Sequence, residues 1–223
     1  MSPITFQAIE EAALLRHGSR ALAERLPKPK SPAELARIPD DRWLSTMTRR
    51  IFQAGLRHAV VDSKWPAFEE AFKGFDPQQV AALFDEDLEA MLQDTRLIRH
   101  MGKLQATRHN AGAMLAIAET HGSFARWVAE WPTSDITGLW VTLAKQMKQL
   151  GGNSAPAFLR MMGKDTFMPT DHVGRALAHW EAFEGGTKSK GDLARLQAVF
   201  TFWHQETGKP LCQLSQILAM SVD

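Results

Sequence analysis

Tyrosine is absent from the 223 residues of the sequence, and cysteine occurs once, as Cys212. One thiol cannot form a disulfide framework within the chain, nor can it supply a cysteine-rich zinc site. A tyrosine phenol is excluded as a catalytic acid, so aromatic contacts depend on 7 Trp and 12 Phe side chains. We therefore expect a fold that is stabilised by burial of apolar side chains rather than by cross-links.

Long hydrophobic runs and a strong excess of either charge are also missing. The first 18 residues, "MSPITFQAIEEAALLRHG", show no basic stretch followed by a long apolar core. We therefore expect no signal peptide, no membrane span and a cytoplasmic location. The formal net charge of +1 excludes a strongly basic arm as the main source of affinity. A local basic face stays open, because phosphate binding depends on where Lys and Arg lie.

Helical signals, by contrast, occur along the whole chain. Apolar residues recur at helical spacing over most of residues 4–26, and "PKPKSP" interrupts the pattern. Ser31 and Glu34 fit a capping box with a proline at the first helical position. Residues 40–56 predict a helix that ends near Gly55. Further N-caps are expected at Asp76, Asp85 and Ser123, and Gly122 is expected to end a long helix.

These signals predict an all-α fold of about ten helices with short connections. We see no fixed-period repeat and no low-complexity tract. The sequence is therefore interpreted as one domain over residues 1–223, with an N-terminal helical extension at about residues 1–30.

The segment "LGGNSAP", residues 150–156, separates two helical patterns. Adjacent glycines permit backbone conformations closed to other residues, and the next helix begins near Ser154 with unpaired N–H groups. Such a corner suits an anion, particularly a phosphate. From the glycines alone, a plain turn between two helices is the simpler interpretation. Basic residues close in sequence are Lys145, Lys148, Arg160 and Lys164.

A longer pattern favours the phosphate interpretation. Gln-Ala-Gly-Leu at 53–56 is followed by "AFKGFDPQQVA" at 71–81 and "RLIRHMGKLQATRHNA" at 96–111. This order resembles the type I 3-methyladenine DNA glycosylases, well over about residues 48–120 and more loosely over 140–178. The resemblance implies the helix–hairpin–helix superfamily of base-excision enzymes. It also implies a two-lobed, wholly helical fold with the DNA cleft between the lobes.

The resemblance also implies site residues. It assigns a wedge that enters the duplex to Gln53, Gly55 and Leu56, although Leu56 fits ordinary core equally well. The hairpin residues expected at the DNA backbone are Lys148, Leu150, Gly151, Gly152 and Ser154. The residues expected around the base are Arg50 and His58, together with Trp43 and Phe52, which lie near the wedge in sequence and suit stacking on a base. Core packing is the alternative for these two aromatic residues.

The stretch "MPTDHVGRAL", residues 168–177, contains the candidate catalytic residues Thr170 and Asp171. Most of the superfamily has an Asp two positions before a His that His172 matches, and Thr170 stands there instead. The 3-methyladenine branch also lacks that Asp, and Asp171 fits an N-cap of the next helix. A purine alkylated at N3 or N7 is already cationic, so it leaves without protonation. The enzyme then mainly extrudes the nucleotide and stabilises developing charge, and no cofactor is expected.

Three departures from the family bear on these expectations. The family branch binds zinc through two Cys and two His, and only His172 has a counterpart, so we expect no metal. The family's pocket glutamate corresponds to Arg50, and a guanidinium facing a cationic purine is electrostatically unfavourable. His58 replaces a family tryptophan, which weakens stacking on a base.

We therefore expect a monomeric, monofunctional DNA glycosylase that hydrolyses the N-glycosidic bond of alkylated purines such as 3-methyladenine. Its partner is double-stranded DNA that contains alkylated bases. A relative that binds lesions without catalysis is the alternative that Arg50 favours. A helical scaffold without a DNA role is a third possibility, which the near-neutral charge favours slightly.

Overall fold

The computed structural model describes residues 4–186 and 189–222, and every regular element in these ranges is a helix. The all-α prediction is confirmed, but 14 α-helices and two 3₁₀ helices are present there instead of about ten helices. One reason for the higher number is that the single helix expected over residues 4–26 is two helices. Gly18, with φ 76°, divides it into α1 (Phe6–His17) and α2 (Ser19–Arg25).

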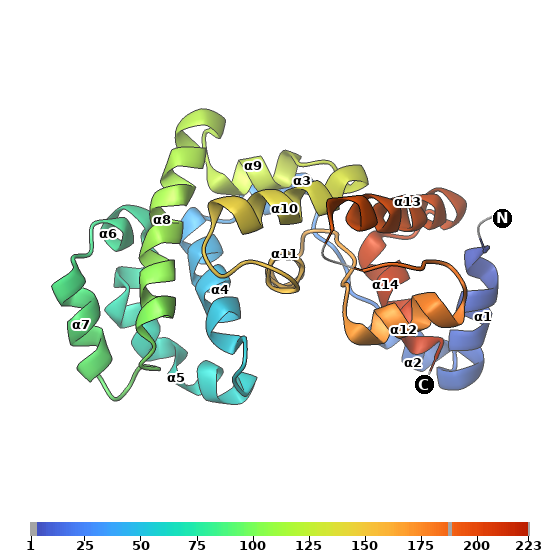
Figure 1. Cartoon of the computed structure of the whole chain (residues 1–223), viewed down its shortest axis with the longest axis horizontal. Coiled ribbons are helices and arrows are strands. Elements are labelled where there is room, and N and C mark those ends of the chain that lie inside the picture. The colour runs from blue at the N-terminus through green and yellow to red at the C-terminus, as the bar shows by residue number, and fades with distance from the viewer. Residues whose placement is uncertain (1–3, 187–188, 223) are drawn as a thin grey trace.

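One end of the molecule is built from the helices between Pro39 and Gly122 (Figure 1). Stacked rings form its core, with the Trp65 centroid 5.1 Å from that of Phe68 and 5.5 Å from that of Phe75. The helices of this end are α4 (Asp40–Gln53), α5 (His58–Ala71), η1 (Lys73–Phe75), α6 (Pro77–Ala81), α7 (Asp85–Gln93) and α8 (Met101–His121).

The opposite end contains α1, α2 and the last three helices (Figure 1). The Phe6 backbone N–H donates to Glu206 Oε2 at 2.9 Å, and Trp203 Nε1 donates to the Ile4 carbonyl at 3.0 Å. The described part of the expected N-terminal extension is thus packed on the C-terminal helices; residues 1–3 lie outside the described ranges. The last three helices are α12 (Asp171–His179), α13 (Lys190–Thr207) and α14 (Leu211–Met220).

A central group of helices joins the two ends (Figure 1). Asp40 at the start of α4 accepts hydrogen bonds from the backbone N–H groups of Phe124 and Ala125 at 3.0 and 2.9 Å. This carboxylate satisfies the free donors at the start of α9. The central helices are α3 (Pro32–Ala36), α9 (Phe124–Glu130), η2 (Thr133–Asp135), α10 (Ile136–Gln146) and α11 (Ser154–Met162).

Most of the predicted helix ends are present. The side chains that cap their helices as predicted are those of Ser31, Asp76 and Ser123. The predicted N-cap at Asp85 is wrong, because Phe84 holds that position and its N–H donates to Asp87 Oδ2 at 2.8 Å. Within the described ranges, no helix combines the length and the apolar character needed to cross a membrane.

Candidate functional site

A cavity of about 520 Å³ opens between the end of α4, the start of α5, α11 and the loop before α12. Its size is typical of pockets that hold a small organic group. Four residues predicted from the sequence as pocket, wedge or catalytic residues meet in its wall: Arg50, Gln53, His58 and Thr170. The remaining lining residues are Asn153, Ala157, Arg160, Met161 and Met168.

The segment from Gln53 to Leu56 forms a tight turn beside this cavity. The Leu56 N–H donates to the Gln53 carbonyl at 3.2 Å, and Gly55 has φ 79°, a conformation that favours glycine. Leu56 is 41% exposed, so the alternative that it belongs to the core is wrong. An exposed leucine at the tip of a fixed turn has the geometry of an intercalating wedge.

Two side chains from other helices hold the turn in place. Lys103 of α8 donates from Nζ to the carbonyls of Phe52 and Ala54, at 3.3 and 2.8 Å. It thereby satisfies free carbonyls at the end of α4, and its burial, together with Arg50, lowers its pKa. Gln53 Nε2 donates to Asp62 Oδ1 at 3.1 Å, which fixes the amide at the cavity wall.

Asp62 is itself oriented by a second hydrogen bond. Arg49 Nε donates to the same oxygen, Asp62 Oδ1, at 2.8 Å. The hydrogen bond from the Arg49 guanidinium lowers the pKa of the Asp62 carboxyl, which is therefore ionised at neutral pH. Because an ionised Asp62 can only accept, Gln53 must turn its Nε2 toward Asp62. The amide oxygen of Gln53 then does not bond to Asp62.

The hairpin between α10 and α11 presents its backbone to solvent. Residues 151–153 and Lys148 are exposed, as a contact with the DNA backbone requires. The same prediction is wrong for Leu150, which is 0% exposed and anchors the hairpin in the core. Ser154 is 8% exposed, and its N–H donates to the Gly151 carbonyl at 3.2 Å. The accessible part of the hairpin is therefore limited to its glycine corner and Lys148.

A buried asparagine on α8 fixes this hairpin. Asn110 is 0% exposed, donates from Nδ2 to the Lys148 carbonyl at 3.1 Å and accepts from the Lys148 N–H at 2.7 Å. Gln149, with φ 60°, adds a bond from its Nε2 to the Gly102 carbonyl at 3.1 Å. Helix α8 thus positions both the wedge turn, through Lys103, and the hairpin.

Arg50 is the unusual residue of the cavity wall. Its Nε is buried and has no hydrogen-bond partner, and no ion pair joins its guanidinium to another described residue. Burial lowers the pKa of Arg50, yet a guanidinium stays protonated at neutral pH. By contrast, Arg160 already donates from Nε and Nη2 to the Thr166 carbonyl, at 3.2 and 2.8 Å.

Thr170 and Asp171 occupy different environments. Thr170 is the N-cap of α12, where its hydroxyl oxygen accepts from the Val173 N–H at 3.2 Å, and it also lines the cavity. The interpretation of Asp171 as the cap is wrong, because Asp171 is already the first helical residue. Asp171 is exposed and does not belong to the cavity lining.

Two aromatic residues expected around the base lie in the core instead. Trp43 is 0% exposed and packs edge-on against Phe124 and Phe158, each with a centroid distance of 5.8 Å. Phe52 is also 0% exposed and meets Phe68 at 4.7 Å. Neither ring can stack on a base without unpacking the core, so these two assignments are corrected.

His172, the counterpart of a family zinc ligand, makes protein contacts with both ring nitrogens. Its Nε2 bonds to the Ala219 carbonyl at 2.6 Å, and Arg175 Nη2 donates to Nδ1 at 2.9 Å. No group of three His, Cys, Asp or Glu in the described part of the chain is placed to hold a metal. The residues present therefore do not fit the family's zinc site, and His172 instead ties α12 to the end of α14.

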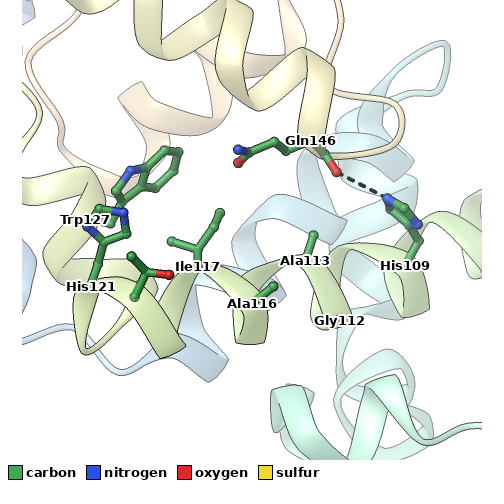
Figure 2. Close-up of a pocket in the computed structure, with 9 residues that line it drawn as sticks. His109, Gly112, Ala113, Ala116, Ile117, His121, Trp127 and Gln146 are labelled. Carbon is green, nitrogen blue, oxygen red and sulfur yellow. Dashed lines mark hydrogen bonds between the residues drawn. The ribbon is translucent and has the colours of Figure 1, made fainter.

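A second cavity, of about 660 Å³, lies between α8 and α10 (Figure 2). Small side chains form much of its wall, and the His109 ring bonds to the Gln146 carbonyl at its rim at 3.2 Å. Trp127 and His121 stand at the opposite side (Figure 2). None of the site residues predicted from the sequence lines this second cavity. The cavity lined by Arg50, Gln53 and Thr170 is therefore the candidate site.

Comparison with known proteins places the chain in a family. Residues 37–157, more than half of the chain, match the model of the methyladenine glycosylase family. The chain belongs to this family. DNA-3-methyladenine glycosylase 1 of Escherichia coli K12 is 41% identical over 76 residues, 34% of this chain and 41% of that protein. The Haemophilus influenzae DNA-3-methyladenine glycosylase is 38% identical over the same length. The matched segment thus spans less than half of these relatives.

Solved structures extend the likeness to the fold of nearly the whole chain. A crystal structure of 3-methyladenine DNA glycosylase I is 28% identical, with a TM-score of 0.51 over 65% of this chain and 87% of that chain. The Methanocaldococcus jannaschii 8-oxoguanine glycosylase/lyase bound to DNA has a TM-score of 0.53 over 96% of this chain and 94% of that chain. Its identity is 17%, so this likeness shows a shared helical fold.

Several residues that shape the site were not anticipated from the sequence. Asn153, the N-cap of α11, and Ala157 and Met161 within α11 recur at steps of four, which places them on one side of the helix, and this spacing was a usable signal. Lys103 is buried under the turn, a position that a charged side chain rarely takes. Met168 offered no signal, because it lies in an irregular loop.

Proposed function

We propose that this chain is a DNA glycosylase of base-excision repair that releases alkylated purines, such as 3-methyladenine, from double-stranded DNA after base flipping. One observation supports the proposal above the others. Gln53 of the wedge turn, Asn153 next to the glycine corner and Thr170 all line one cavity of about 520 Å³. Family membership and the names of the bacterial relatives agree with it.

In this proposal the two exposed loops grip and open the duplex. The N–H groups at Gly151 and Gly152 and the charge of Lys148 contact phosphates, and the start of α11 adds a favourable dipole. Leu56 enters the stack and occupies the gap left by the extruded nucleotide. Asn110 and Lys103 keep the two loops at a fixed separation, so the enzyme does not have to order them when it binds.

The released base supplies much of the driving force for the chemistry. The bond between C1′ and N9 breaks, and its electron pair neutralises the positive charge of the alkylated purine. A water oxygen bonds to C1′, and the water loses a proton. Asp171 lies outside the cavity lining but directly follows Thr170, which lines it, and we assign the Asp171 carboxylate as the acceptor of that proton through a relaying water. Neither Lys103 nor Lys164 has a free amine for a Schiff base, since each side chain is buried and its Nζ donates to backbone carbonyls.

Binding of a lesion without catalysis is the second candidate. The observation that favours it is the composition of the cavity wall, because none of the nine lining residues is acidic. A protein of this kind would protect or mark a lesion rather than remove it.

Release of free base from methylated duplex DNA tests the proposal. The expected result is a time-dependent release of alkylated purine by the wild-type chain, together with a log affinity for DNA that falls steeply with log salt. Tight binding to abasic DNA with no base released would favour the second candidate. A flat salt response would contradict phosphate contacts altogether. We further propose that the protein acts as a monomer in the cytoplasm.

A further inference from the structure

We propose that Arg50 determines which alkylated purine is released, and that it selects alkylated guanines over alkylated adenines. This inference rests on the proposed function, because it concerns the base that occupies the same cavity. It starts from Arg50 in the wall of the cavity, whose buried Nε has no hydrogen-bond partner and whose guanidinium forms no ion pair with a described residue. Arg50 is half-buried, and its buried Nε donor has no partner, which is costly and points to a ligand that accepts hydrogen bonds.

The neighbours of Arg50 do not relieve this charge. Lys103 adds a second positive charge, and its pKa is lowered by burial and by the nearby Arg50. Arg160 supplies a third, and its Nε and Nη2 already donate to the Thr166 carbonyl. The carboxylate of Asp62, near the turn, already accepts hydrogen bonds from Arg49 and Gln53. Among the cations of this wall, Arg50 therefore has the free planar fork of donors.

A guanidinium fork discriminates purines at position 6. Guanine presents two acceptors side by side, O6 and N7, which match the two parallel N–H groups of an arginine. Adenine presents an N6 amino group instead of O6, so one donor would face another donor. An adenine in this cavity would leave part of the Arg50 fork unpaired, which costs more than the bond itself contributes. Guanine is thus the complementary base.

The charge of the lesion does not alter this choice. Purines alkylated at N3 or N7 carry the same formal positive charge, so repulsion from Arg50 and Lys103 is common to adenine and guanine lesions. What differs is the atom at position 6. The order among guanines follows from the same reasoning, because 3-methylguanine keeps both O6 and N7 as acceptors. A methyl group at N7 removes one acceptor, so 7-methylguanine should be the poorer partner of Arg50.

One assay compares all three bases in the same reaction. Duplex DNA treated with a methylating agent contains 3-methyladenine, 3-methylguanine and 7-methylguanine, which chromatography separates after release. Each rate is normalised to the spontaneous rate for the same base, since intrinsic lability differs. The wild-type chain should release 3-methylguanine roughly ten- to a hundredfold faster than 3-methyladenine on this scale. Calorimetric binding of the two free bases provides a readout that does not require catalysis.

Variants of Arg50 separate specificity from general damage. Arg50→Gln should lower the guanine-to-adenine ratio at least about tenfold. Arg50→Lys, which keeps the charge without the fork, should lower the ratio similarly, because the planar geometry is what reads O6 and N7. Arg50→Glu should reverse the preference, since a carboxylate accepts from the adenine amino group. Arg37→Gln, at an exposed arginine outside the cavity, is the matched control and should leave the ratio unchanged.

The outcomes distinguish this inference from the proposed function. Faster release of 3-methyladenine by the wild type, or a ratio that Arg50→Gln does not move, would overturn the inference and leave the glycosylase intact. Release of no base would overturn the proposed function. The calorimetry then decides the inference alone: tighter binding of 3-methylguanine than of 3-methyladenine supports it, and equal or reversed affinities contradict it.

Discussion

Asn110 and Lys148 are joined by a pair of hydrogen bonds in which one buried amide group satisfies both backbone groups of a single hairpin residue. The bond lengths are 3.1 Å from Asn110 Nδ2 to the carbonyl and 2.7 Å from the Lys148 N–H to Oδ1. Through this pair the long helix α8 fixes the entrance to the glycine corner. The hairpin therefore owes its position to a residue 38 positions earlier in the chain.

Replacement of Asn110 should weaken both the fold and DNA binding. Asn110→Ala leaves two backbone groups of Lys148 unpaired, so we expect a loss of about 1 to 3 kcal/mol in the free energy of unfolding by urea. DNA affinity should fall as well, because the hairpin must be ordered on binding. Asn110→Asp retains the acceptor and loses the donor, and its effect should be intermediate. An unchanged affinity in Asn110→Ala would show that the hairpin does not contact DNA.

Leu56 should matter for duplex DNA and not for stability. Its side chain is 41% exposed, so Leu56→Ala removes little burial. Without the wedge the extruded state loses stabilisation, and we expect base release from duplex DNA to slow about tenfold or more. Leu15→Ala, at a leucine of α1 that is 89% exposed, is the control. Equal release rates for the two variants would remove Leu56 from the account.

Asp171 should affect the rate of base release with no loss of fold. Its side chain is exposed and the cap of α12 belongs to Thr170, so Asp171→Asn should leave the melting temperature nearly unchanged. Loss of the proton acceptor should slow release about a hundredfold under single-turnover conditions. Asp85→Asn, at the first position of α7, is a matched exposed control. A rate equal to that of the wild type would mean that the cationic base leaves unaided.

Because Lys164 is buried, we expect the free energy of unfolding of the protein to increase at alkaline pH. Burial lowers the pKa of Lys164 from 10.5 to about 8, while its Nζ donates to the carbonyls of Ala129 and Trp131. Below pH 8 both folded and unfolded chains hold the proton, so the cost of the buried charge is fully present. Between about pH 8 and 10.5 the unfolded chain binds more protons, and stability rises with pH.

The comparison with Lys164→Met isolates this contribution from other titrating groups. Urea unfolding between pH 7 and 10 should show the wild type gaining about 1 to 3 kcal/mol relative to the variant. Parallel pH profiles for the two proteins would contradict the assignment of a lowered pKa to Lys164.

Local features of the fold were predictable from the sequence, whereas long-range ones were not. The Ser31–Glu34 capping box and the end of α4 near Gly55 depend on residues a few positions apart, and both are present. A carboxylate or amine that caps a helix far away in the chain has no recognisable spacing in the sequence. Asp40 caps α9, and Asp165 accepts from the N–H groups of Leu211 and Cys212 at the start of α14.

The site residues were likewise predicted only in part. The family resemblance predicted Arg50, Gln53 and His58 as site residues, and they share one wall. It also predicted Trp43 and Phe52 at the base, because an aromatic residue on an amphipathic helix does not reveal which face it takes. Their helix turns both rings into the core, and only tertiary packing decides this.

A crystal structure of the chain with a duplex that carries a stable abasic-site analogue tests the central claim most directly. The account predicts Leu56 inside the gap in the stack, the N–H groups at Gly151 and Gly152 on one phosphate, and the empty sugar facing Thr170. DNA bound across the α8–α10 cavity of Figure 2, with the Gln53–Leu56 turn left in solvent, would contradict it.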